Sequence, residues 1–329
     1  AQRDLRQFDA AKDSLARALK TGDALAGNPH RWTGQVLASQ AWLAAQTGQG
    51  DKALPLAEEA LRQQRAFSGE HSVDFLRVAH DVSALQIARG QLDEAQALIE
   101  LIDREAETLP DYPVIDRLGA RAQLASVRFA RGEFEAARAL LAELVPRYDR
   151  HVGAPYDRTA VVRSTYARTL AELGDYAQAV RVQQANVANV APRAAAEPEA
   201  VNLVRLQLVR LLTQAGRAGE AEPLARELLD FFEERYAEPT RYREAARAYL
   251  ADAQLALGRR DEGLRTLQMS IDQAARLGAA DNPLERANKQ LNWAVAARGL
   301  PGAAGLEVSQ QACARHLAAL GAANPRSRR

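Results

Sequence analysis

Cysteine and methionine are almost absent from the sequence. The one cysteine, Cys313, excludes a disulfide within the chain and any cysteine-rich metal site. We expect Cys313 to be a small packed residue of the last amphipathic segment. The one methionine, Met269, is not an initiator, so we expect the chain to be a fragment or a processed product of a larger protein.

An excess of charge and a long apolar run are also missing. Lysine and arginine number 43 and aspartate and glutamate 42, which gives a formal net charge of +1. This balance argues against general nucleic-acid binding, which needs a concentrated cationic surface. No run approaches the ~18 apolar residues of a membrane helix, and the polar start of the chain does not resemble a signal peptide. We expect a cytoplasmic protein, or a periplasmic one if its parent has an upstream membrane span.

Recognisable catalytic motifs are missing as well. The five histidines form no HExxH pair, and the sequence has no nucleophile elbow, phosphate-binding loop or kinase motif. The GxG at Gly48 lacks the third glycine and the preceding strand of a dinucleotide site. We therefore predict no enzymatic activity, no metal site and no cofactor.

A six-residue pattern that begins with glycine and mostly ends with alanine recurs at a fixed interval. It reads GQLDEA from Gly90 and GDYAQA from Gly174, for example. Successive copies begin 42 residues apart, at Gly48, Gly90, Gly132, Gly174, Gly216 and Gly258. Degenerate copies stand at Arg6 and Gly299. Such a fixed interval indicates one supersecondary structure that is stacked repeatedly.

The spacing of apolar residues predicts a helix on each side of the glycine. Positions twelve, eight and five before the glycine have helical spacing and form one packed stripe, and small residues mostly stand seven positions before it. The segments after the glycine, such as LDEAQALIELIDREAETL, have the same helical period. Glycine suits the positive φ of the turn between the two helices. A proline column marks the connection to the next repeat, at Pro29, Pro113, Pro155 and Pro239.

Each repeat is therefore a helix pair that can bury its apolar face only by stacking on its neighbours. No segment alternates as a strand does, so we predict an all-α fold, a solenoid of antiparallel helix pairs. We expect one domain over residues 1–322, made of a partial repeat 1–29, six full repeats 30–281 and a divergent end repeat 282–322. We expect residues 323–329 to be a disordered tail.

The turn sequence resembles that of a known repeat family. GDYAQA from Gly174, a Gly-x-aromatic-x-x-Ala turn, is similar to the tetratricopeptide repeat. The 42-residue length, Pro55 and Pro223 in the second helix, and the loop from Gly69 resemble the kinesin-light-chain-like class that is common in bacteria. The resemblance covers residues 6–322 and implies a right-handed superhelix. Such arrays resemble C-terminal regions of bacterial Ser/Thr kinases, transcriptional regulators and nucleotide-switch proteins.

The resemblance implies a concave groove lined by the first helix of each repeat, near thirteen, ten, six and three positions before the glycine. The residues selected at those positions are Gln35, Trp42, Arg77, His80, Ser164, Arg168, Arg210, Thr213, Asp252, Arg286, Lys289 and Trp293. Cations outnumber anions among them, so we expect a mildly basic groove that suits an acidic peptide or protein segment. Alternatively, these arginines are solvated side chains without a binding role. The class often has asparagine nine and ten positions before the glycine, and the absence of that ladder here weakens the analogy with kinesin-like peptide recognition.

Two further sets of polar residues stand out. Four arginines fall eleven positions before successive turn glycines, at Arg121, Arg163, Arg205 and Arg247. They could hold carboxylates or phosphates of a partner, or each could pair with an acid of its own or the adjoining repeat, which is the interpretation we favour. One second helix has polar residues where other repeats have Ala, Leu or Ile, namely Gln183, Gln184, Asn186 and Asn189. Because buried polar groups need partners, this helix is either a weak point or a contact site.

These features predict a non-catalytic interaction or sensor region of a larger bacterial signalling or regulatory protein, which binds a protein segment in its groove. Two alternatives stay open: a sensor gated by a small molecule, and a scaffold for self-association. A long acidic partner favours the first function, and a closed pocket lined by arginine and aromatic side chains favours the small-molecule sensor. A symmetric apolar patch on an end repeat favours the scaffold.

Overall fold

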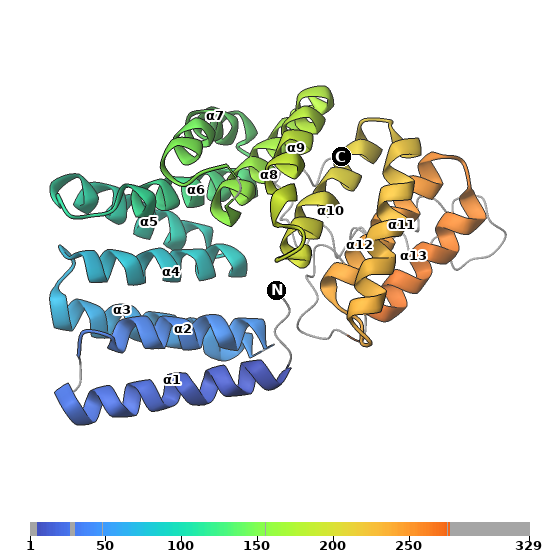
Figure 1. The fold of residues 1–329 in the computed structure, drawn as a ribbon. Coiled ribbons are helices and arrows are strands. Elements are labelled where there is room, and N and C mark those ends of the chain that lie inside the picture. The colour runs from blue at the N-terminus through green and yellow to red at the C-terminus, as the bar shows by residue number, and fades with distance from the viewer. Residues whose placement is uncertain (1–4, 27–29, 48, 155, 275, 277–329) are drawn as a thin grey trace. The chain divides into compact units, whose positions relative to one another are not determined.

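The computed structural model describes residues 5–26, 30–47, 49–154, 156–274 and 276, which are helical throughout apart from their connections (Figure 1). No strand occurs among these residues, and the predicted all-α solenoid of helix pairs is confirmed. In the same ranges no helix is both long enough and apolar enough to cross a membrane. The predicted end repeat 282–322, the tail 323–329 and Cys313 lie outside the described residues.

The helices alternate between two places in the repeat. The first helices precede the turn glycine and are α2 (Thr33–Gln46), α4 (Val73–Arg89), α6 (Val114–Ala130), α8 (Asp157–Glu172), α10 (Pro198–Gln214) and α12 (Arg241–Ala256). The second helices follow the turn and are α1 (Leu5–Ala26), α3 (Gly50–Ser68), α5 (Leu92–Thr108), α7 (Phe134–His151), α9 (Tyr176–Val190), α11 (Ala218–Arg235) and α13 (Arg260–Ala274). A 3₁₀ turn, η1 (Ala191–Arg193), follows α9.

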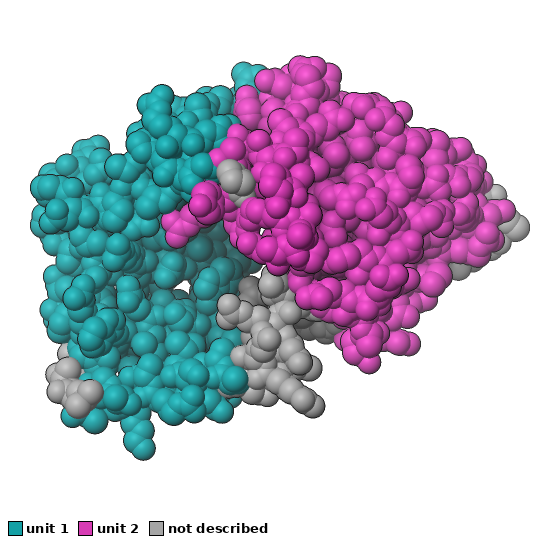
Figure 2. All heavy atoms as spheres, in the orientation of Figure 1, with its two compact units in different colours: residues 1–153 teal, residues 154–329 magenta. Residues whose placement is uncertain are grey.

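The chain forms two compact bodies, residues 1–153 and residues 154–329 (Figure 2). The N-terminal body contains α1 to α7, and the C-terminal body contains α8 to α13. Inside each body the apolar side chains of one repeat pack against those of the next, as Leu37, Val78 and Val82 do in the N-terminal body. The proposal that residues 1–322 make a single domain is not tested by this division and stays a prediction.

Glycine sets the geometry of the turn inside each repeat. Gly90, Gly132, Gly174, Gly216 and Gly258 have φ between 74° and 85°. A left-handed backbone costs a residue with a Cβ about 1–2 kcal/mol, and glycine avoids that cost. The next N–H then bonds back to the first helix, as Gln91 N does to Gln86 O at 2.9 Å, and satisfies a terminal carbonyl. The predicted turns are confirmed at these five glycines, and Gly48 lies outside the described residues.

Small buried residues let the two helices of a repeat approach closely. The position five residues after the glycine is fully buried alanine at Ala53, Ala95, Ala137, Ala179 and Ala221. The last described repeat has Gly263 there, because a Cβ would lie 2.7 Å from the Leu255 side chain. A larger side chain at this position would force the helices apart, since protein interiors are close-packed.

Replacing Gly174 by alanine tests the turn. An added Cβ meets no atom within 4 Å, so the positive φ alone should lower the free energy of unfolding, by about 1–2 kcal/mol. The matched control is Gly219→Ala in α11, where the Cβ also meets nothing within 4 Å but the backbone is helical. That change should stabilise by up to about 1 kcal/mol. Thermal melts followed by circular dichroism should therefore move in opposite directions, and a common direction would contradict this explanation.

Candidate functional site

The first helices form the more closely spaced layer of each body. In the N-terminal body α4 contacts both α2 and α6, and in the C-terminal body α10 contacts both α8 and α12. Among the described residues no second helix contacts another second helix to a comparable extent. When the helices on one side of a stack lie closer together than those on the other side, the stack curves toward the closer side. The first helices therefore line the concave face of each body. The predicted groove residues lie on these helices.

Two arginines of the N-terminal body, one just before α2 and one on α4, pair with acids of the next repeat. Arg31 Nε donates to Asp74 Oδ2 at 3.2 Å, and Arg77 Nε donates to Asp116 Oδ2 at 3.3 Å. Burial, and then the Asp116 carboxylate, raise the pKa of the nearby Tyr112 hydroxyl further above its ordinary value, so this hydroxyl stays uncharged. These ion pairs offset the positive charges of Arg31 and Arg77.

The other predicted groove residues of the N-terminal body differ in exposure. Trp42 is 41% exposed, and Gln35 is half-buried. His80 packs over Gly119, where a Cβ would lie 2.8 Å from the ring Nε2. Its position therefore depends on a small residue in the next first helix, and the imidazole is only partly available to a ligand.

In the C-terminal body the predicted groove residues lie half-buried on three successive first helices. They are Ser164 and Arg168 on α8, Arg210 and Thr213 on α10, and Asp252 on α12. Arg168 and Arg210 occupy the same place in consecutive repeats, six residues before the turn glycine. The Arg210 Nε is shielded from solvent and has no hydrogen-bond partner among the described residues. Predicted residues Arg286, Lys289 and Trp293 lie outside those residues.

The arginine column bonds to groups of the same chain. Arg121 and Arg205 each reach a glutamate on the second helix of their own repeat, Glu143 at 3.1 Å and Glu227 at 2.7 Å. Arg163 donates to a backbone carbonyl just before its own helix at 3.2 Å. These contacts support the interpretation that the column holds helices together.

The last member of the column lies in a buried ion cluster. Glu244 is 0% exposed and accepts hydrogen bonds from Arg247 and, at 3.1 Å, from Arg243 Nε. Arg247 also donates to Glu233 Oε1 of the preceding second helix at 2.5 Å. A buried carboxylate is costly unless it is paired and hydrogen-bonded, so the two arginines keep Glu244 compatible with the core.

Sequence reasoning missed the acceptors next to this column. Asn202 Oδ1 accepts from Arg205 at 3.0 Å, as Glu244 accepts from Arg247. Each acceptor stands three residues before its arginine, a spacing that places both on one helix face. That repeated spacing is the signal that could have revealed them.

The polar residues of α9 have two different environments. Gln183 and Asn186 are fully buried, whereas Gln184 and Asn189 lie nearer the solvent. Gln183 Nε2 donates to Val204 O of α10 at 2.8 Å. Asn186 Nδ2 donates to Ala160 O of α8 at 2.9 Å and to Ser164 Oγ at 3.0 Å. The buried amides thus tie α9 to the first helices on both sides.

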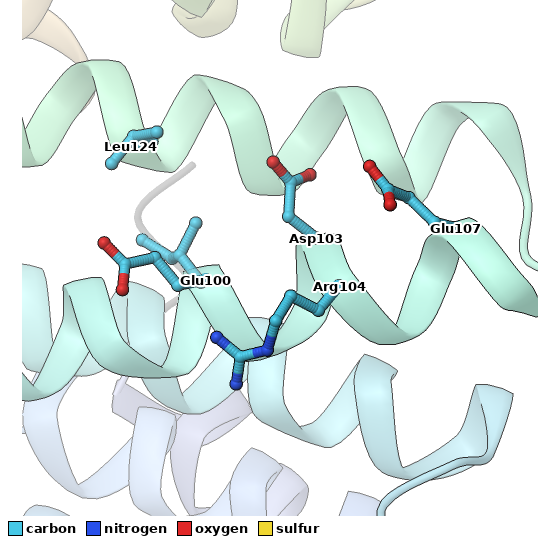
Figure 3. A pocket seen from close by; sticks show the side chains of 6 residues that line it. Glu100, Asp103, Arg104, Glu107 and Leu124 are labelled. Atoms are coloured by element: carbon cyan, nitrogen blue, oxygen red, sulfur yellow. The ribbon is translucent and has the colours of Figure 1, made fainter.

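A surface hollow of about 310 Å³ lies between α5 and α6, and none of the predicted groove residues lines it (Figure 3). Figure 3 shows three carboxylates around it, from Glu100, Asp103 and Glu107, with Arg104 nearby. Its lining is open and acidic, which does not suit an enclosed small-molecule site. Within the described part of the chain no three His, Cys, Asp or Glu side chains are arranged to hold a metal ion.

Several of the helix pairs match the sequence model of a known repeat family. Five segments match the sequence model of the tetratricopeptide repeat, residues 34–59, 118–143, 160–182, 202–227 and 245–269. These five segments are similar to tetratricopeptide repeats. Each matched segment runs from a first helix through the turn into the following second helix, and the resemblance inferred from the turn sequence is confirmed at this level.

Solved structures with the same fold include three informative neighbours. Tetratricopeptide-like repeats of a kinesin light chain from Podosopora anserina are 24% identical with a TM-score of 0.51, over 62% of this chain and 96% of that one. A Rap protein bound to Competence and Sporulation Factor is 12% identical with a TM-score of 0.59, over 88% of each chain. A signal-transduction ATPase with a tetratricopeptide repeat sensor, from Pyrococcus horikoshii, is 13% identical with a TM-score of 0.57, over 87% of this chain and 42% of that one.

These likenesses show the fold alone, because the identities are low. A comparison with the curated proteins gives no match.

The buried and exposed ends of the arginine column should respond differently to truncation. Arg247→Ala leaves the buried Glu244 with one cation fewer and should lower the free energy of unfolding by about 3 kcal/mol or more. Arg121 is 35% exposed, so Arg121→Ala should cost less than about 1 kcal/mol. Thermal melting of the two variants compares them directly, and equal shifts would show that burial of the cluster does not matter.

Proposed function

We propose that this chain is a non-catalytic regulatory module that binds an acidic protein segment on the first-helix layer of its C-terminal body. The observation that carries the proposal is the contrast between the two bodies. Ion pairs offset the charges of Arg31 and Arg77 in the N-terminal body, whereas the Nε of Arg210 has no hydrogen-bond partner among the described residues. Arg168 stands in the same place on the neighbouring helix.

The spacing of these arginines suits an extended segment. Adjacent packed helices lie about 8–10 Å apart, and residues three apart on an extended chain are separated by about 10 Å. A segment with acids three residues apart can therefore present one carboxylate to each arginine. Guanidinium groups favour such carboxylates because they can donate two parallel hydrogen bonds.

Two neighbours support a regulatory role. One is a Rap protein complexed with Competence and Sporulation Factor, and the other is a signal-transduction ATPase whose sensor is a tetratricopeptide repeat. The proposal makes the chain part of a bacterial signalling regulator that acts in the cytoplasm. Repeats of this kind supply a binding surface along a stack of helices, and the proposal requires no catalysis.

A displayed library of random peptides, selected on the whole chain, tests the proposal. We expect the selected peptides to be rich in Asp and Glu. Arg168→Glu with Arg210→Glu should abolish their binding by replacing attraction with repulsion. The matched control is Arg181→Glu with Arg265→Glu, exposed arginines of second helices α9 and α13, which changes the net charge equally. The control should retain binding. Loss of binding in both variants would show that net charge, and not these two arginines, determines the binding.

Salt provides an independent test of the same contacts. The Debye length falls from about 10 Å at 0.1 M to about 3 Å at 1 M ionic strength, so binding of the selected peptides should weaken as salt is added. Fluorescence anisotropy with a labelled peptide measures this. Affinity that does not depend on salt would contradict a carboxylate–arginine interface.

A further inference from the structure

Serine and threonine hydroxyls in these helices usually donate to the carbonyl four residues earlier. This local bond satisfies the hydroxyl without a partner. It is made by Ser39 to Gln35 O at 2.8 Å, Ser126 to Ala122 O at 3.1 Å, Thr165 to Val161 O at 3.0 Å, Thr169 to Thr165 O at 2.8 Å and Thr213 to Val209 O at 3.1 Å.

Ser164 departs from this pattern because the carbonyl four residues earlier is already occupied. Ala160 O accepts from Asn186 Nδ2 at 2.9 Å and, as part of regular helix α8, from the backbone N–H of Ser164. A carbonyl oxygen has two lone pairs, so no place is left there for the Ser164 hydroxyl.

The orientation of the Asn186 amide follows from the same contact. Ala160 O can only accept, so the atom of the amide that faces it must be the nitrogen and not the oxygen. The same nitrogen donates to Ser164 Oγ at 3.0 Å. Ser164 Oγ is therefore an acceptor toward the core, and its own hydrogen must point elsewhere. Within the described residues that hydrogen has no acceptor, although Ser164 lies half-buried on the first-helix layer.

We propose that Asn186 holds the Ser164 hydroxyl as a hydrogen-bond donor for the bound segment. Arg168 follows Ser164 by four residues, so both side chains lie on one face of α8. A neutral donor and a guanidinium on the same face recognise one carboxylate of the acidic segment. Asn186 does not touch the ligand and is a positioning residue. This inference rests on the proposed function and assigns a specificity determinant within the same surface.

Packing alone does not require asparagine at this place in the repeat. The equivalent residues of the other repeats are Ala60, Ile102, Leu144, Leu228 and Ser270. Ala60 and Asn186 are both fully buried, so alanine is compatible with a closely packed second helix. Asn186→Ala should therefore fold, and it frees Ala160 O to accept the Ser164 hydroxyl.

The test uses a fluorescein-labelled selected peptide whose binding requires Arg168 and Arg210. Ser164→Ala should weaken its binding about tenfold, as expected for a lost hydrogen bond to a charged group, with little change in the melting midpoint. Asn186→Ala should cause a similar loss, because Ser164 then donates to Ala160 O. The double variant should bind no more weakly than either single variant, since both changes remove the same donor.

Gln183→Ala is the matched control. Gln183 is as fully buried as Asn186 and donates to Val204 O, but among the described residues it makes no hydrogen bond to a side chain of the first-helix layer. Its loss should lower the melting midpoint and leave the peptide affinity unchanged.

Three outcomes would overturn the inference. Unchanged affinity in Ser164→Ala would show that the hydroxyl does not contact the ligand, while the proposed function would stand. If the Asn186→Ala and Gln183→Ala variants bound the peptide with equal affinity, Asn186 would have no positioning role. If no selected peptide requires Arg168 and Arg210, the proposed function and this inference both fail.

Discussion

The close approach of two helices across buried small side chains is the constraint on which the rest of the structure depends. Ala95, Ala137 and Ala179 are fully buried at one place in their repeats, next to a turn that glycine alone forms without strain. Because protein interiors are close-packed, the helix pair has little freedom once these positions are set. The same pair then recurs every 42 residues, and within each body the successive first helices lie next to one another.

Arginine serves two purposes on this scaffold, and the surroundings separate them. Arg205 and Arg247 bond to glutamates of their own body, and the Glu244 cluster is closed off from water. Such a cluster contributes to the fold only while all its partners are present. Arg210 lies on the first-helix layer with a shielded Nε that no described residue accepts from. The proposed function follows from this contrast, because a guanidinium N–H that no described residue accepts from is available to a ligand.

The helix pairs and turns could be predicted from the sequence because both depend on local properties. The positive φ at Gly174 could be expected because this glycine stands between two segments with the apolar spacing of a helix. The hydrogen bonds of the buried α9 amides could not be predicted, since they join residues 21 to 26 positions apart whose rotamers depend on packing. Asn186 stood out as polar at an apolar position, but the atoms to which it donates were visible only in three dimensions. Glu244 could have been found by its spacing from Arg247. The lining of the groove, taken from the family resemblance, stays a prediction at every residue.

The central claim is that ligands bind on the first helices of the C-terminal body. Photo-cross-linking with a diazirine-labelled selected peptide, followed by mass spectrometry of the digested complex, tests it most directly. The account predicts cross-links on α8 and α10, around Ser164, Arg168 and Arg210. Cross-links confined to the second helices α9 and α11, or to the N-terminal body, would contradict it.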